Sequence, residues 1–328
     1  MDIVFFGSGQ FAVKSLEALR LAKHKIALVV TQPDKPKGRH LNFLPTEIKN
    51  KARELKLDIY QPQNPNSDEA LLYLKQFPAD LFIVIAYGHI LKNQILGLPK
   101  LFPLNIHASL LPKYKGAAPI NWAIINGEKE TGISIIKMNE LIDAGEILLQ
   151  RKITIEQGDN AQTLEEKLEV LAARSLPEAL DLIEKNSVNF IKQDNKKASL
   201  APKLEKRHGL INWNNDTVSI VNQIRGLVPW PGAFTYYKSK LIKIWSARPV
   251  QNLFPFSNCP AVLNGVKAAH DKSAAKPAEI LEINKKGIII GCANGALIIT
   301  ELQLESGKRL AAEAFILGHK LIVGDKLG

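Results

Sequence analysis

The sequence has few cysteines and no long apolar run. Cys259 and Cys292 are the two cysteines among 328 residues, too few for a disulfide framework, and neither lies in the paired Cys/His spacing of a zinc site. The longest apolar stretches, such as residues 81–86 and 287–291, fall far short of the roughly 20 residues that a membrane-spanning helix needs. The N-terminal residues also lack the pattern of a signal peptide. We therefore expect a cytoplasmic protein with no metal and no membrane partner.

The composition is that of a globular protein, and its charge is unevenly distributed. With 46% hydrophobic and 23% charged residues, the chain can form sizeable cores, and its length predicts two domains. From residue 201 onward, 17 Lys and Arg face 9 Asp and Glu, whereas residues 1–200 carry 26 against 23. This basic C-terminal third predicts a polyanion-binding module beside a small-molecule site. A basic surface that only aids solubility is the alternative.

Short apolar runs alternate with segments of helical spacing in the first half of the chain. This alternation predicts an α/β fold, a Rossmann-like, doubly wound and mostly parallel sheet. The expected strands are residues 3–6, 26–31, 81–85, 104–107 and 133–138, and the expected helices are residues 48–55, 69–74 and 119–125.

The second half of the chain has a helix, a polar stretch and then short strands. Thr163 and Glu166 have the spacing of a capping box that opens a helix, which Pro177 is expected to kink or restart. The predicted divisions are a catalytic domain over residues 1–185, a polar linker over 186–205 and a smaller β-barrel domain over 206–328. The expected barrel strands are residues 233–237, 241–246, 278–283, 287–291 and 296–300.

The glycines after the first expected strand have the spacing of a dinucleotide-binding turn. Residues 7–12 read Gly-Ser-Gly-Gln-Phe-Ala, which satisfies G-x-G-x-x-A. Such a site also needs an acidic residue about 20 positions later to bind the ribose hydroxyl. Val29, Val30 and Thr31 occupy those positions. We therefore interpret the glycines as a tight turn between strand and helix, not as an NAD(P) site.

Two polar residues lie at the end of an expected strand. Asn105 and His107 are two positions apart, so both side chains leave the same face of the strand. The carboxyl end of a strand in a doubly wound sheet is where ligands bind. This pair is therefore the candidate reacting centre, with Asp143 as its candidate carboxylate. An ordinary Asp-Ala-Gly turn is the alternative for residues 143–145.

The loop after this strand carries a distinctive motif. Residues 108–120 read ASLLPKYKGAAPI. Together with Asn105-x-His107 and Asp143-Ala144-Gly145, this run resembles the formyltransferases that use 10-formyltetrahydrofolate, and most closely those that act on methionyl-tRNA. The resemblance covers most of the chain, and its supporting matches are residues 31–36, 86–88, 130–132, 203–213 and 224–234.

The resemblance implies an activity and a set of roles. The formyl group of 10-formyltetrahydrofolate would pass to the α-amine of methionine on initiator methionyl-tRNA. Asn105 and His107 would stabilise the negative oxygen of the tetrahedral intermediate, and Asp143 would orient His107 and help to move a proton. The second domain would be an OB-like barrel, and the protein a monomer. The implied folate contacts are Ser109, Leu110, Leu111, Pro112, Tyr87 and Gly88.

The resemblance also implies two tRNA-binding regions. One is the long loop over residues 32–45, and the other is the basic second domain. The loop departs from the family pattern at residues 40–42, where His-Leu-Asn replaces a further glycine and lysines. The implied contacts are Lys35, Lys37 and Arg39 in the loop, and Lys206, Arg207 and Arg225 in the second domain. The alternatives are a formyltransferase or deformylase with another small substrate, and an RNA-binding protein without catalysis.

Overall fold

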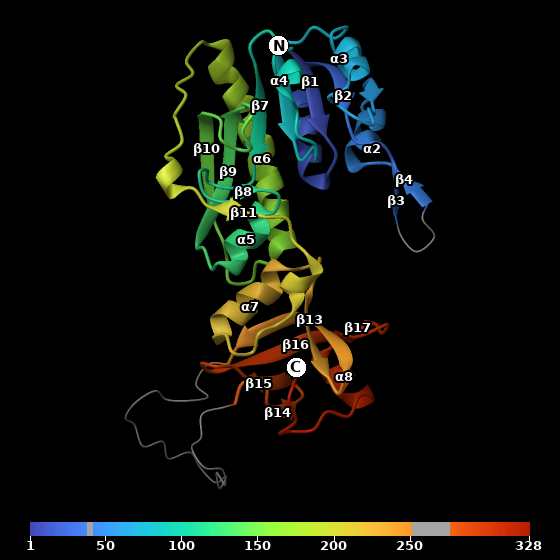
Figure 1. The fold of residues 1–328 in the computed structure, drawn as a ribbon, viewed down its shortest axis with the longest axis vertical. Coiled ribbons are helices and arrows are strands. Elements are labelled where there is room, and N and C mark those ends of the chain that lie inside the picture. The colour runs from blue at the N-terminus through green and yellow to red at the C-terminus, as the bar shows by residue number, and fades with distance from the viewer. Residues whose placement is uncertain (38–41, 251–275) are drawn as a thin grey trace. The chain divides into compact units, whose positions relative to one another are not determined.

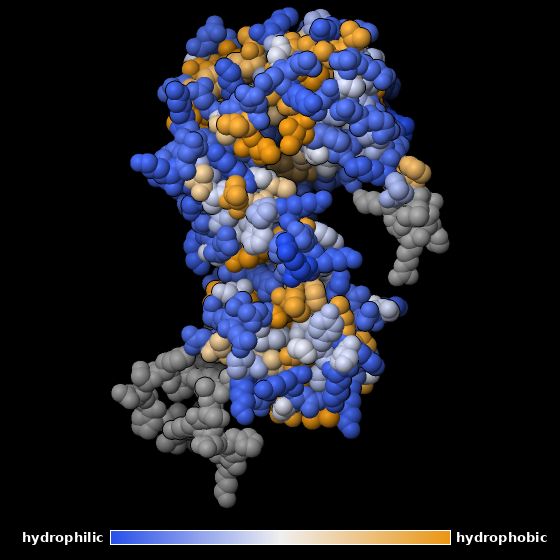
Figure 2. All heavy atoms as spheres, viewed as in Figure 1, coloured by the Kyte–Doolittle hydropathy of each residue, from blue (hydrophilic) through white to orange (hydrophobic). Residues whose placement is uncertain are grey.

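The computed structural model describes residues 1–37, 42–250 and 276–328. The chain forms two compact units. Unit 1 comprises residues 1–120, 129–157 and 163–203, and unit 2 comprises residues 121–128, 158–162 and 204–328. Apolar side chains fill a core in each unit, whereas the visible surface of each is mostly hydrophilic, interrupted by hydrophobic groups (Figure 2). None of the described helices is long and apolar enough to cross a membrane.

A seven-stranded sheet forms the centre of unit 1 (Figure 1). Its order is β10-β9-β7-β6-β1-β2-β5. The five strands from β7 to β5 are parallel, which confirms the mostly parallel sheet, but β9 and β10 are antiparallel to their neighbours. The strands are β1 (Asp2–Gly7), β2 (Lys25–Val30), β5 (Ile59–Tyr60), β6 (Leu81–Ile85), β7 (Phe102–His107), β9 (Glu130–Lys137) and β10 (Ile147–Thr154).

Unit 1 also contains two short strand pairs that are not part of this sheet. The hairpin β3 (Lys35–Lys37) and β4 (Asn42–Leu44) follows β2, and β8 (Lys115–Gly116) pairs in parallel with β11 (Leu200–Ala201). β11 belongs to the stretch predicted as a linker. That stretch is therefore bonded to unit 1, and the contacts of unit 1 extend to residue 203.

Two of the helices in the first 125 residues begin at a polar cap. Thr46 accepts a hydrogen bond from the Lys49 backbone at the start of α2, and Ser67 accepts one from Ala70 at the start of α3. The helices are η1 (Gln10–Ala12), α1 (Val13–Leu21), α2 (Glu47–Glu54), α3 (Asp68–Leu74), α4 (Asn93–Leu96) and α5 (Pro119–Ile125).

The long helix α6 (Ala161–Glu184) differs from its prediction in two ways. It begins two residues before Thr163, and it continues through Pro177 without restarting, whereas a kink at Pro177 stays a prediction. Proline removes one backbone hydrogen bond, which costs about 3 kcal/mol in a helix interior. The buried face, which includes Leu168, Leu176 and Leu180, continues past the proline with no exposed area. Burial of this face offsets the lost bond, because each fully buried leucine contributes about 1.5–3 kcal/mol.

Unit 2 contains an antiparallel sheet in the order β12-β13-β16-β15-β14, with β17 paired to β16. Among the described residues the strands form this open path, so the predicted closed barrel is not confirmed. The helices α7 and α8 were not predicted. The elements are η3 (Lys206–Gly209), α7 (Thr217–Gly226), β12 (Ala233–Tyr237), β13 (Lys240–Pro249), β14 (Ile280–Asn284), β15 (Gly287–Gly291), β16 (Ala296–Leu304), β17 (Arg309–Ala311) and α8 (Ala312–Gly318).

One glycine of the unit 1 sheet has no room for a side chain. A Cβ on Gly132 in β9 would lie 2.0 Å from the carbonyl oxygen of Arg151 in β10, whereas a Cβ on Gly158 would meet nothing within 4 Å. We expect Gly132→Ala to destabilise the protein by about 1–3 kcal/mol through overpacking, and Gly158→Ala to leave the thermal midpoint unchanged. Thermal unfolding of both variants checks this. Equal midpoints for the two would contradict the close approach of β9 and β10.

Candidate functional site

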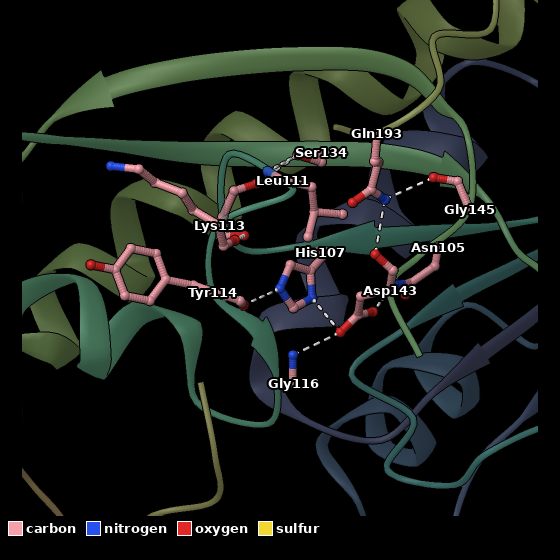
Figure 3. A network of polar contacts seen from close by, with 11 residues as sticks. Asn105, His107, Leu111, Lys113, Tyr114, Gly116, Ser134, Asp143, Gly145 and Gln193 are labelled. Carbon is pink, nitrogen blue, oxygen red and sulfur yellow. Dashed lines mark hydrogen bonds and ion pairs between the residues drawn. The ribbon is translucent and has the colours of Figure 1, made fainter. Parts of the chain in front are cut away.

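The three predicted catalytic residues meet at the carboxyl end of β7 (Figure 3). Asn105 and His107 leave the same face of the strand, and Asp143 comes from the connection between β9 and β10. The Asn105 Nδ2 donates to Asp143 Oδ1 over 3.3 Å. The His107 Nδ1 lies 3.4 Å from Asp143 Oδ2, and both side chains are largely buried. The carboxylate therefore contacts both other members of the group.

The second nitrogen of the His107 ring also has a partner. Its Nε2 lies 2.8 Å from the backbone carbonyl oxygen of Tyr114. A carbonyl and a carboxylate only accept hydrogen bonds, so both contacts are satisfied when both ring nitrogens carry hydrogen. The ring is thus held from two sides in a fixed orientation.

The backbone around Asp143 is unusually constrained. Asp143 has a φ of 50°, a left-handed conformation that residues with a side chain seldom adopt. Its Oδ2 accepts a hydrogen bond of 2.9 Å from the Gly116 backbone. Two positions later, a Cβ on Gly145 would lie 1.7 Å from the Lys137 carbonyl oxygen. Only glycine fits at position 145, which gives the Asp-Ala-Gly motif a physical reason.

The predicted folate segment after β7 is held by side chains that the motif did not indicate. The Ser134 Oγ donates to the Ser109 carbonyl over 2.7 Å and accepts from the Leu111 backbone over 3.0 Å. The Gln150 Nε2 donates to the Leu111 carbonyl over 2.9 Å. The Ser109 hydroxyl itself donates to the Lys113 carbonyl. These bonds fix the loop over β9 and β10.

The four residues of this segment differ in exposure. Ser109 and Leu111 are buried, whereas Leu110 and Pro112 are half-buried. Leu110 and Pro112 are therefore the members whose side chains are more accessible to a ligand.

Tyr87, also predicted near the folate, turns its side chain into the core. Its ring packs edge-on against Phe6 at 5.4 Å between centroids. Burial raises the pKa of its hydroxyl, which has no hydrogen-bond partner among the described residues. The backbone carbonyl of Tyr87 accepts a hydrogen bond from Ser8 Oγ and another, of 2.7 Å, from Gln32 Nε2. Gly88 has a φ of 80°, and a Cβ there would lie 2.4 Å from Gln32 Nε2.

A nicotinamide cofactor bound at the turn after β1 would need an acidic residue at the end of β2, and no acidic residue lies there. A Cβ on Gly7 would lie 2.8 Å from the Phe5 ring and 3.1 Å from the Ala12 side chain. The residue at the end of β2, Thr31, is buried and hydrogen-bonded to Ser8 and Thr46. The geometry supports the interpretation as a tight turn.

A polar cluster anchors the base of the loop over residues 32–45. The Lys49 Nζ lies 2.7 Å from Asp34 Oδ2, and the Gln61 Nε2 donates to Asp34 Oδ1 over 2.9 Å. The hydrogen bond from Gln61, which has the larger effect, and the one from Lys49 lower the pKa of the Asp34 carboxyl. Lys35 is exposed and donates to Gln32.

Lys37 and Arg39 are the other two predicted tRNA contacts in this loop. Lys37 lies in β3, where its backbone pairs with Asn42. Arg39 lies outside the described residues, so its prediction stays one from sequence.

The predicted cations of unit 2 have two different environments. Lys206 and Arg207 are exposed on η3, and Arg207 forms an ion pair of 3.0 Å with Glu205. Arg225, in contrast, is half-buried in α7, and its guanidinium donates to Asn222 Oδ1 over 3.0 Å and to the Asp159 carbonyl over 3.2 Å. Burial lowers the pKa of Arg225. Asn222 and Asp159 both belong to unit 2.

Comparison with known proteins identifies the family. The formyl transferase model matches residues 1–180, and the model of the formyl transferase C-terminal domain matches residues 203–320. A methionyl-tRNA formyltransferase of Geobacter sulfurreducens is 37% identical over 100% of this chain and 97% of its own. Another, from Caldanaerobacter subterraneus subsp. tengcongensis, is 40% identical over 99% of both chains. This chain belongs to the methionyl-tRNA formyltransferase family.

Among solved structures, an N-formyltransferase from Helicobacter canadensis, in complex with folinic acid and dTDP-3-aminofucose, has the same fold. Its TM-score is 0.64 at 19% identity, over 90% of this chain and 98% of that one. Membership of the methionyl-tRNA formyltransferase family makes the protein a formyl-transferring enzyme. In the part of the chain that the structure describes, no three His, Cys, Asp or Glu side chains gather as metal ligands would.

Sequence reasoning missed several residues that support the site of this family member. Apart from the contact of Tyr114 with His107, seven residues away, they act through hydrogen bonds between segments 25 to 85 residues apart in the chain. A single sequence carries no signal for such pairs, although the polar residues in buried strands were detectable as unusual. The residues are Tyr114, Gly116, Ser134, Gln150, Gln193 and Ser199.

Proposed function

We propose that this protein transfers the formyl group of 10-formyltetrahydrofolate to the α-amine of initiator methionyl-tRNA, giving N-formylmethionyl-tRNA for translation initiation. The observation that carries the proposal is the contact of Asn105, His107 and Asp143 in a chain that aligns end to end with proteins named methionyl-tRNA formyltransferase. We further propose that the protein is a cytoplasmic monomer and needs no metal.

The reaction makes one carbon–nitrogen bond, breaks another and moves one proton. The amine nitrogen attacks the formyl carbon, the carbonyl oxygen becomes negative in a tetrahedral intermediate, and the bond from the carbon to the folate nitrogen then breaks. The proton that the amine loses ends on tetrahydrofolate. Hydrogen-bond donors directed at the negative oxygen lower the barrier, because that charge exists only in the transition state and the intermediate.

Asn105 and His107 are the proposed donors. The Asn105 amide has two hydrogens, one of which is directed at Asp143, and the other can serve the formyl oxygen. The Nε2 hydrogen of His107 can serve the same oxygen in exchange for the Tyr114 carbonyl that it contacts in this structure. The Nδ1 contact with Asp143 then keeps the ring oriented.

Asp143 has two proposed tasks. Its Oδ2 lies 3.4 Å from the His107 Nδ1 and so keeps the ring oriented as a donor. It can also accept, through a water molecule, the proton that leaves the amine. The hydrogen bond from Gly116 holds the carboxylate in position for both.

The proposal assigns substrate contacts to both units. In unit 1, Ser109, Leu110, Leu111 and Pro112, with the backbone of Tyr87 and Gly88, would contact the folate. The tRNA would contact Lys35, Lys37 and Arg39 in the loop after β2, and an OB-like sheet in unit 2 with Lys206, Arg207 and Arg225.

One assay tests the function. Purified protein is supplied with 10-formyltetrahydrofolate and either methionyl-tRNA, free methionine or an amino sugar nucleotide, and released tetrahydrofolate is measured. We expect turnover with methionyl-tRNA at least about a hundredfold above either small amine, because remote binding energy supports the chemical step. Comparable turnover with a small amine, or release of formate without an acceptor, would refute the tRNA assignment.

Removing either proposed donor should reduce catalysis and spare binding. We expect Asn105→Ala and His107→Ala each to lower kcat by about a hundredfold or more, with little change in the affinity for methionyl-tRNA. Steady-state kinetics and equilibrium binding measure the two effects separately. Near-normal kcat in either variant would remove that residue from the proposed chemistry.

The different environments of the unit 2 cations predict different effects. We expect Lys206→Met and Arg207→Met to weaken tRNA binding and reduce its salt dependence, with unchanged thermal stability, because both side chains are exposed. Arg225→Met should weaken tRNA binding as well and, unlike the other two, lower stability by about 1–3 kcal/mol, since it leaves buried acceptors without their donor. Binding titrations at several salt concentrations and thermal unfolding distinguish the two groups. Unchanged stability in Arg225→Met would contradict its structural role, and unchanged tRNA binding at unchanged stability would remove it from the proposed contacts.

A further inference from the structure

A segment outside the family motifs reaches the reacting centre. Residues 191–201, called the strap here, are bonded to unit 1 at both ends. Ile191 exchanges two backbone hydrogen bonds with Ile147, of 2.8 and 2.9 Å. At the other end, β11 (Leu200–Ala201) pairs with β8 (Lys115–Gly116). The strap therefore passes the Asp143 turn between two fixed points.

Gln193 of the strap bonds the backbone on both sides of Ala144 (Figure 3). Its Nε2 donates to the Asp143 carbonyl over 2.9 Å and to the Gly145 carbonyl over 2.8 Å. Both hydrogens of the amide nitrogen are used. The amide oxygen is buried and has no hydrogen-bond partner among the described residues. The bonds that this side chain makes with the Asp143 turn therefore come from its two donors.

These two bonds hold a left-handed part of the site's backbone. Asp143 has a φ of 50°, which aspartate adopts more readily than most residues, and the bonds from Gln193 stabilise this conformation. Bonds to the carbonyls of residues 143 and 145 fix the peptide planes that follow the Asp143 Cα. They thereby set the direction in which the carboxylate leaves the backbone. That direction brings Oδ1 to Asn105 and Oδ2 to Gly116.

The far end of the strap acts on the other partner of His107. The Ser199 Oγ accepts a hydrogen bond of 2.9 Å from the Tyr114 backbone, and the Ser199 carbonyl accepts one of 2.8 Å from Lys115. Tyr114 has a φ of 61° and supplies the carbonyl that contacts the His107 ring. One segment thus supports the partners on both sides of that ring.

We propose that Gln193 is a positioning residue of this enzyme. It acts through the backbone of Asp143 and holds the carboxylate against Asn105, His107 and Gly116. The expected loss of kcat rests on the proposed function, whereas the expected effect on the position of the Asp143 carboxylate does not.

The test uses the full chain with Gln193→Met and a matched control. Methionine keeps the length of the side chain and removes its donors. Gln223 of α7 is a similar glutamine, since its Nε2 also donates to two carbonyls, those of His208 and Leu210, over 2.8 and 3.0 Å. Gln223→Met therefore removes the same kind of bonds in unit 2.

We expect Gln193→Met to lower kcat with methionyl-tRNA by about tenfold or more, with KM for the folate within about twofold, because a misplaced carboxylate affects the reaction rather than folate binding. The thermal midpoint should fall no further than in Gln223→Met, whose kcat should be unchanged. Unchanged kcat in Gln193→Met, or equal losses of kcat in both variants, would overturn the proposal.

Gln193→Glu adds a readout that packing alone would not move. The charged carboxylate would face two carbonyl oxygens, so its kcat should lie below that of Gln193→Met. Lowering the pH protonates this carboxyl, which can then donate one hydrogen bond. The kcat of Gln193→Glu relative to wild type should therefore rise as the pH falls, whereas the ratio for Gln193→Met should stay flat. A flat ratio for Gln193→Glu would contradict the donor role.

Amide hydrogen exchange at Gly116 tests the proposal without any substrate. The Gly116 N–H donates to the Asp143 carboxylate, so its exchange should be about tenfold faster in Gln193→Met and unchanged in Gln223→Met. Unchanged exchange in Gln193→Met would overturn the positioning role even if wild type formylates methionyl-tRNA. An inactive wild type with faster exchange in Gln193→Met would instead refute the proposed function and keep the positioning role.

Discussion

The carboxylate of Asp143 is the point at which three separate parts of unit 1 are joined. It accepts hydrogen bonds from Asn105 on β7 and from the Gly116 backbone, and it faces the His107 ring. A largely buried carboxylate would be unstable without such partners, because burial removes its hydration. The same contacts satisfy the charge and align the two proposed donors. Stability of the charge and orientation of the site are therefore one requirement.

The fold meets this requirement by combining a rigid sheet with close backbone contacts. β7 is paired on both sides, to β6 and β9, so Asn105 and His107 cannot shift along the strand. The turn that carries Asp143 closes only because Gly145 allows contact with the Lys137 carbonyl. Asp143 and Tyr114 both have a left-handed backbone, and the hydrogen bonds from Gln193 and with Ser199 hold these two conformations.

Much of the fold could be predicted from sequence because it depends on local patterns. Buried runs such as β1 and β6 follow from uninterrupted apolar residues, and the shared face of Asn105 and His107 follows from strand geometry. The direction of β9 could not be predicted, since an apolar run of that kind fits a parallel or an antiparallel neighbour. The helix through Pro177 depends on burial that only the packed structure shows.

The candidate site was predictable in its reacting groups and not in their supports. Asn105, His107 and Asp143 belong to compact motifs, whereas Gln193 lies in a polar stretch that looked like a linker. Polar composition near a domain boundary favours a solvated segment, and a single glutamine gives no indication of the two carbonyls that it binds. Closure of the unit 2 sheet is likewise a property of pairing between distant strands and stays a prediction.

The two units are interleaved along the chain, and this limits modularity. Residues 121–128 and 158–162 lie within the first family domain but cluster with unit 2, where Asn121 Nδ2 donates to the Gly226 carbonyl over 2.8 Å. Conversely, unit 1 extends to residue 203, beyond the end of α6. No single cut separates one complete unit from the other. If the second domain were exchanged between family members, α5 and the turn before α6 would have to be exchanged with it or match its surface. The sequences of these two segments should therefore vary together with that of the second domain rather than with that of the reacting centre.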